Sequence, residues 1–122
     1  MANNKDFKAK NRATALAFHE KVTALTSASG AMTADLSASS IFTSTLTEDT
    51  EVTLSNPPAS GSIGYATFVL KADSGTHKIY FDKAVNYDTA VYDITTAQWI
   101  ITLQTSDGGS NYSGAYAVQG AA

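Results

Sequence analysis

The chain has no cysteine, only two prolines and few charged residues among its 122 residues. Without cysteine, a disulfide framework, a thiolate metal site and a cysteine nucleophile are all excluded. Charged residues make up only 16% of the chain, against roughly 25% in typical soluble domains, and hydrophobic residues make up 43%. The N-terminus lacks the apolar core of a signal peptide, and no run approaches the length of a transmembrane helix. We therefore expect one soluble domain, made in a cytosol and stabilised by packing or by partners.

What the sequence does contain is short apolar alternation. Val52 and Leu54 stand two positions apart before a turn, and Ala66, Phe68 and Leu70 do so after it. This spacing places the apolar side chains on one face of a pleated strand. Threonine and serine fill the opposite face, where a β-branched side chain with a hydroxyl suits a surface in water.

Turn residues separate eight such runs, and no helical segment stands between them to connect parallel strands. We therefore expect an all-β fold, an antiparallel β-sandwich or jelly-roll-like body of about eight short strands over residues 31–122. The strands are predicted at residues 31–36, 40–47, 51–55, 65–72, 78–83, 90–95, 98–105 and 113–119. The predicted core consists of Phe42, Leu46, Val52, Leu54, Phe68, Leu70, Ile79, Phe81, Val91, Trp99, Ile101 and Leu103.

Residues 1–30 are predicted to be a basic N-terminal arm and linker. Residues 1–21 hold five cations and two carboxylates, a net charge of +3, whereas the rest of the chain holds three lysines and nine carboxylates, a net charge of −6. The spacing of Ala15, Phe18, Val22 and Leu25 suits a short amphipathic helix. The alternative is an extended arm, in which Phe7 and Phe18 fill pockets of a neighbour. A flexible connector is expected at residues 26–30.

The residues capable of chemistry do not form a convincing set. Neither His19 nor His77 has a partner by spacing, so a catalytic triad is rejected. The acidic cluster of Glu48, Asp49 and Glu51 and the turn at residues 107–111 are interpreted as solvated turns in preference to metal sites. A glycosidase pair drawn from Asp82, Asp88 and Asp93 is not favoured either. We expect no enzyme activity, no cofactor and no metal.

The stretch from Thr45 to Lys71 resembles part of a known class of proteins. Its first strand ends in Leu-Ser-Asn-Pro-Pro-Ala-Ser-Gly, residues 54–61, and an aliphatic and aromatic strand follows. The pattern resembles a small β-domain of tailed-phage virion proteins, among them tail-fibre modules and capsid-associated proteins, over about residues 32–118. The resemblance implies a structural protein of the virion, assembled in the host cytoplasm, and for capsid-binding members frequently a homotrimer.

We therefore expect a capsid decoration or cement protein that docks through its arm on the major capsid protein, with no nucleic acid or membrane as partner. The expected docking residues of the arm are Lys5, Phe7, Lys8, Lys10, Arg12, Phe18 and Lys21. The run from Trp99 to Ile101 is apolar on both faces, which indicates a second cover from a neighbouring subunit. The expected interface or surface residues are Tyr80, Ile100 and Tyr116. The alternative is a tail-fibre or receptor-binding module that recognises host polysaccharide through exposed tyrosines.

Overall fold

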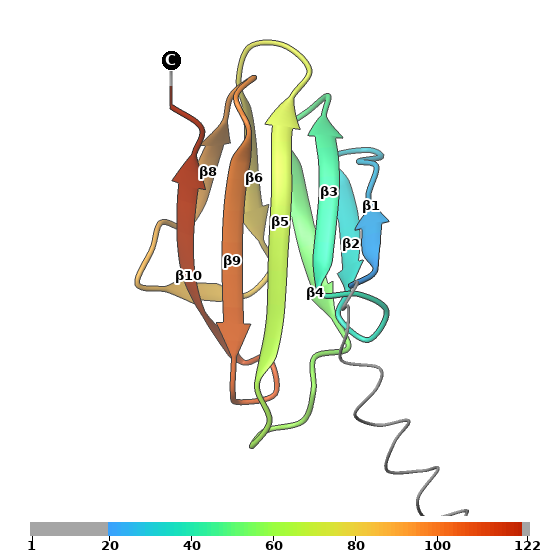
Figure 1. Cartoon of the computed structure of the whole chain (residues 1–122), viewed down its shortest axis with the longest axis vertical. Coiled ribbons are helices and arrows are strands. Elements are labelled where there is room, and N and C mark those ends of the chain that lie inside the picture. Colours follow the sequence, from blue (N-terminus) through green and yellow to red (C-terminus); the bar gives the residue numbers. More distant parts are fainter. Residues whose placement is uncertain (1–19, 121–122) are drawn as a thin grey trace, which may run out of the picture.

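The computed structural model describes residues 20–120 and consists of β-strands and turns (Figure 1). The ten strands are β1 (Val22–Ala24), β2 (Ala31–Asp35), β3 (Ile41–Leu46), β4 (Thr50–Ser55), β5 (Gly64–Ala72), β6 (His77–Phe81), β7 (Ala84–Asn86), β8 (Val91–Ile94), β9 (Trp99–Thr105) and β10 (Asn111–Val118). Within residues 20–120 no helix is present that is long and apolar enough to cross a membrane. The expected all-β class is confirmed, while most of the expected arm lies outside the described residues.

The strands form two sheets that face each other across one core in a sandwich-like arrangement (Figure 1). One sheet has six strands in the order β1-β3-β5-β9-β10-β7, and the other has four in the order β2-β4-β6-β8. From β1 to β6, odd-numbered strands therefore belong to the six-stranded sheet and even-numbered strands to the other. The chain crosses the core at every connection in this half of the molecule.

This crossing makes many neighbouring strands parallel, and the expected antiparallel sandwich is wrong in this respect. β1, β3 and β5 pair in parallel, and so do β2, β4 and β6. Two neighbouring parallel strands need a connection that returns the chain to its starting end. Here the intervening strand of the opposite sheet makes that return, so no crossover helix is needed. The later strands β5, β9 and β10 pair antiparallel, as do β6 and β8, whereas the short β7 pairs in parallel with β10.

The core follows the predicted alternation with two exceptions. Phe68 lies at its centre, completely buried, with ring centroids 5.3 Å from Phe42 and 5.2 Å from Phe81. Ten of the twelve predicted core residues are buried. Val91, by contrast, is 42% exposed, because β8 turns Tyr92 and Ile94 inward instead. Trp99 is only partly buried, at the margin of the core.

Of the two alternatives for the N-terminal segment, a helix and an extended arm, the helix does not extend over residues 22–24, because these residues form β1. Val22, Thr23 and Ala24 align with the first three residues of β3. Val22 and Leu25 fit both a helical spacing and a short strand, and the free edge of β3 decides between them by offering backbone partners. The segment that follows is also fixed, because Ala28 and Ala31 form a β-bridge.

The proline-rich turn between β4 and β5 packs tightly on two glycines. A Cβ atom added to Gly64 would lie 2.6 Å from Cδ of Pro58, and one added to Gly109 would lie 2.6 Å from Cγ of Pro57. Both distances are shorter than atomic contact allows. The turn that gives the sequence its resemblance is therefore closed against the start of β5 and the β9–β10 loop.

Truncation of Phe68 should cause a large loss of stability. Phe68→Ala is expected to lower the free energy of unfolding by about 3–5 kcal/mol, because it removes a completely buried ring and leaves a cavity between the sheets. Chemical denaturation followed by circular dichroism measures this change. Ile63→Ala, at a side chain that is 47% exposed, is the control and should cost far less. Equal losses for the two variants would contradict the assigned core.

Candidate functional site

The outer face of the six-stranded sheet is a surface without carboxylates on its strands. Thr43 aligns with Val69, Val69 with Ile100, and Ile100 with Ala117, so that one row of outward side chains crosses four strands. A second row of small and β-branched side chains runs beside it: Ile41, Thr67, Thr102 and Ala115. The strands of this sheet contain no Asp or Glu and a single charged residue, Lys71. We call the outward-facing residues of β3, β5, β9 and β10 the carboxylate-free face.

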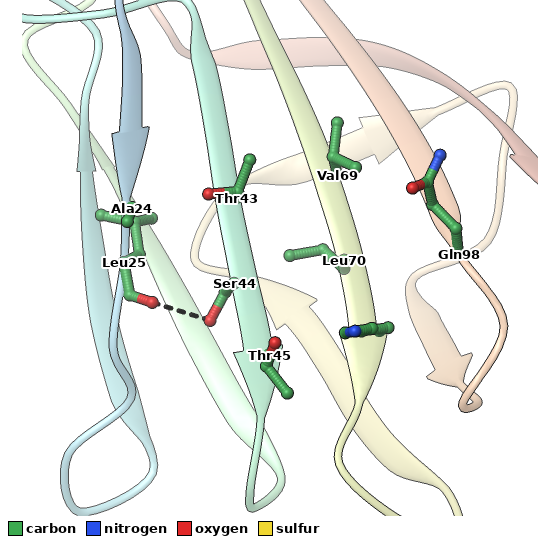
Figure 2. A pocket seen from close by; sticks show the side chains of 9 residues that line it. Ala24, Leu25, Thr43, Ser44, Thr45, Val69, Leu70 and Gln98 are labelled. Carbon is green, nitrogen blue, oxygen red and sulfur yellow. Dashed lines mark hydrogen bonds between the residues drawn. The ribbon is translucent and has the colours of Figure 1, made fainter.

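A hollow of about 330 Å³ opens on this face where β1 ends (Figure 2). Thr43 and Val69 project into view from neighbouring strands, and Gln98 stands at the start of β9 (Figure 2). The Ser44 hydroxyl donates a 2.8 Å hydrogen bond to the carbonyl oxygen of Leu25 and fixes the segment that leaves β1. Lys71 is the one titratable residue in the lining. The hollow therefore has groups that can form hydrogen bonds with a partner, but it has no acid–base pair.

A second hollow, of about 210 Å³, lies on the same face over β9 and β10. Its lining is formed by Ile100, Thr102 and residues 115–117, and it contains no charged side chain. The linings of both hollows are thus mainly hydroxyl-bearing and aliphatic, with Lys71 and Gln98 in the first and Tyr116 in the second. Such a surface suits contact with another neutral, flat surface more than recognition of an ion.

The four-stranded sheet has the opposite character on its outer face. Its strands contain the carboxylates of Asp35, Glu51 and Asp93, and Lys78 Nζ lies 2.7 Å from Asp93 Oδ1. This hydrogen bond and the attraction of the carboxylate raise the pKa of Lys78. The two faces of the molecule are therefore electrostatically different, one acidic and one free of carboxylates.

The three carboxylates of the acidic cluster at the β3–β4 turn point toward different neighbours. Glu48 Oε2 accepts hydrogen bonds from the Ser27 hydroxyl at 2.6 Å and the Gly30 amide at 3.0 Å, and these bonds lower the pKa of Glu48. Asp49 accepts from the Lys78 amide at 2.8 Å. Glu51 points outward from β4. The three carboxylates are directed to different neighbours, as expected of residues in a turn.

The turn between β9 and β10 is also held by its acidic residue. Asp107 accepts hydrogen bonds from the Asn111 amide at 3.0 Å, from Asn111 Nδ2 at 3.2 Å and from the Thr105 hydroxyl at 3.0 Å. The backbone bond from Asn111 is the main reason that the pKa of Asp107 is lowered. The turn interpretation of residues 107–111 agrees with this geometry.

His77 has a partner that its spacing did not suggest. Its Nε2 atom lies 2.9 Å from Asp73 Oδ1, and this contact lowers the pKa of Asp73. The Ser74 amide donates to the same oxygen at 2.7 Å. A nucleophilic triad requires histidine between serine and carboxylate, whereas here the carboxylate stands between the other two. The arrangement closes the β5–β6 turn and does not activate the Ser74 hydroxyl.

Each of the three aspartates from which a glycosidase pair could be drawn makes a contact with another part of the protein. Asp82 accepts from the Leu54 amide at 2.9 Å, Asp88 accepts from the Tyr92 hydroxyl at 2.9 Å, and Asp93 pairs with Lys78. Burial and the bond to Asp88 raise the pKa of Tyr92. These contacts explain the positions of the carboxylates without a substrate.

The structure does not bring the predicted surface aromatics and Ile100 together. Tyr80 points outward from the four-stranded sheet, and Ile100 points outward from the six-stranded sheet on the opposite side. Tyr116 lies at a margin, where its ring stacks on Trp99 at a centroid distance of 5.4 Å. Lys21 is exposed beside β1. The other arm residues, from Lys5 to Phe18, lie outside the described residues.

No family model, curated protein or solved structure in the comparisons matches the chain. In residues 20–120, no group of three or more His, Asp or Glu side chains is placed to hold a metal ion. The carboxylate-free face is therefore the site that the geometry itself singles out. Sequence reasoning selected Ile100 as an interface residue but missed the rest of this face, although its strands are free of Asp and Glu.

The Glu48 contacts should make stability depend on pH in a defined direction. The pKa of Glu48 is lowered in the folded state, so its contribution is complete above the unfolded pKa of about 4.3 and is lost as the pH falls below it. Glu48→Gln should therefore lower the melting temperature at pH 7, and its difference from the wild type should shrink toward pH 3. Thermal melts across this range measure the effect.

Glu51→Gln is the matched control, because this carboxylate is exposed on the outer face of β4 and accepts no hydrogen bond within residues 20–120. It should leave the melting temperature nearly unchanged at both ends of the pH range. A Glu48→Gln difference that stays constant or grows on acidification would contradict the role assigned to the carboxylate.

Proposed function

We propose that this protein is a structural component of a phage virion, a capsid decoration or cement protein that docks on the major capsid protein through its basic N-terminal segment. The observation that carries the proposal is the division of charge. Residues 1–21 have a net charge of +3, whereas the acidic remainder has its strand carboxylates on the four-stranded sheet alone. A basic segment attached to an acidic body is suited to docking on an acidic protein surface.

The arrangement of the body supports a role in binding. The carboxylates at Glu48, Asp73 and Asp107 serve turns, and the hollows on the carboxylate-free face contain no acid–base pair. The resemblance of residues 45–71 to tailed-phage β-domains indicates the class of particle. Nucleic acid is a less suitable partner, because the acidic body would repel phosphate.

The basic segment supplies the first test of this function. A variant in which Lys5, Lys8, Lys10 and Arg12 are all changed to Gln should bind more weakly by about fourfold to nearly a thousandfold, because four charge contacts of about 0.2–1 kcal/mol each are removed. Co-sedimentation with shells of the major capsid protein encoded alongside this chain measures the affinity. Electron microscopy of the loaded shells should show many symmetric copies on the head.

The matched control neutralises two lysines of the body, Lys71→Gln and Lys83→Gln, and should bind within about threefold of the wild type. Circular dichroism should show that both proteins are folded. If the neutralised N-terminal segment binds shells as tightly as the wild type, docking through this segment is wrong. Copies confined to the tail would instead indicate host recognition.

Host-polysaccharide recognition is the second candidate, and the Trp99–Tyr116 pair favours it. The two rings are stacked within 15° of parallel, and Tyr116 is 50% exposed. Exposed aromatic rings at the margin of a β-fold offer flat apolar surfaces on which a sugar ring packs.

The single tryptophan makes this second candidate simple to examine. If glycan binds at the pair, host polysaccharide should change the fluorescence of Trp99 in a saturable manner, and Tyr116→Ala should remove the response. Tyr80→Ala, at an exposed tyrosine on the other sheet, serves as the control and should respond as the wild type does. An unchanged Trp99 spectrum at saturating polysaccharide would rule out this site.

A further inference from the structure

The carboxylate-free face combines apolar character with exposure at Ile100. Ile100 is 38% exposed near the start of β9, a strand whose other side is buried. Its neighbours across the sheet are Val69 and Ala117, and the next row pairs Thr67 with Thr102. A sheet with β-branched aliphatic residues on both faces is typical of a sheet that is covered on both sides.

The charge of the carboxylate-free face determines which partner can bind to it. The N-terminal segment has five cations among its first 21 residues and would find no carboxylate on these strands to pair with. An anionic ligand would find only Lys71. A partner for this face must therefore be neutral and moderately apolar.

A second copy of the chain presents such a surface. Each copy has a net charge of −3, so most approaches between two copies bring carboxylates together. The carboxylate-free face is the part of the described surface where two acidic copies meet without this repulsion. Lys71 stands beside Val69 toward the end of β5, where its ammonium group reaches the solvent at the rim of a contact.

We propose that the carboxylate-free face binds the same face of a second copy and forms a symmetric dimer. Two identical sheet faces stack about a two-fold axis, as do the two sheets of a sandwich, at a separation of about 10 Å. The contact uses no residue of the N-terminal segment and so does not rest on the proposed function. The trimer implied by the resemblance would require a different surface.

The mass of the full-length protein in solution tests this proposal. Sedimentation equilibrium over a concentration series should show a dimer for the wild type and a monomer for Ile100→Glu, because the substitution places two carboxylates within an apolar contact. Val91→Glu is the matched control, since Val91 is 42% exposed on the outer face of the other sheet, and this variant should remain dimeric.

A wild-type protein that stays monomeric, a trimer, or an Ile100→Glu variant that remains dimeric would each overturn the proposal. Circular dichroism establishes that the variants are folded. If Ile100→Glu does not fold, Thr102→Glu on the same face takes its place, because Thr102 is an exposed position without an apolar side chain to lose.

Spin labels then identify the face that is buried. The chain has no cysteine, so Thr102→Cys and Val91→Cys each carry one label. With four sheets stacked about 10 Å apart, labels at position 102 should lie close together, and labels at position 91 should be about 30 Å apart or more. The reverse order of distances would place the contact on the four-stranded sheet and overturn the proposal.

Discussion

The two sheets are held together by a continuous chain of aromatic contacts, on which the rest of the structure depends. Phe42 stacks on Phe68 within the six-stranded sheet, and Phe68 contacts Phe81 across the core. Phe81 and Tyr92 pack edge to face with ring centroids 6.1 Å apart. Tyr92 in turn contacts Tyr116 of the six-stranded sheet, with ring centroids 5.6 Å apart. A chain with no cysteine has no disulfide to join its layers, so this packing must fix their separation and register. The outward-facing residues of β3, β5, β9 and β10 keep their positions because the inner side of the same sheet is anchored in this way.

Much of the strand content was predictable, because it follows from local alternation. All eight predicted runs coincide with observed strands to within a few residues, and ten of the twelve predicted core residues are buried. The error at Val91 arose because it adjoins Tyr92 and both residues suit a core. The structure buries Tyr92, whose hydroxyl donates to Asp88, and so satisfies its polar atom.

The pairing of the strands could not be predicted in the same way. Alternation states which side chains point inward, but it contains no information on which sheet a strand joins. β1 and β7 have three residues each, too few for a periodic signal, and the spacing of Val22 and Leu25 also fits a helix. For the same reason the carboxylate-free face as a whole could not be predicted, although Ile100 was expected at an interface. Asp35, Glu51 and Asp93 are scattered along the sequence, and only the assignment of their strands to one sheet separates them from the other face.

The alternate crossing of the core also has a consequence for how the chain folds. Among the strands of residues 20–120, β9 and β10 are the only consecutive pair joined by hydrogen bonds. Every other pairing must wait until a strand further along the chain is available, which raises the entropic cost of the first contacts and slows folding. Within residues 20–120, β9 and β10 therefore form the one local hairpin from which the six-stranded sheet can grow.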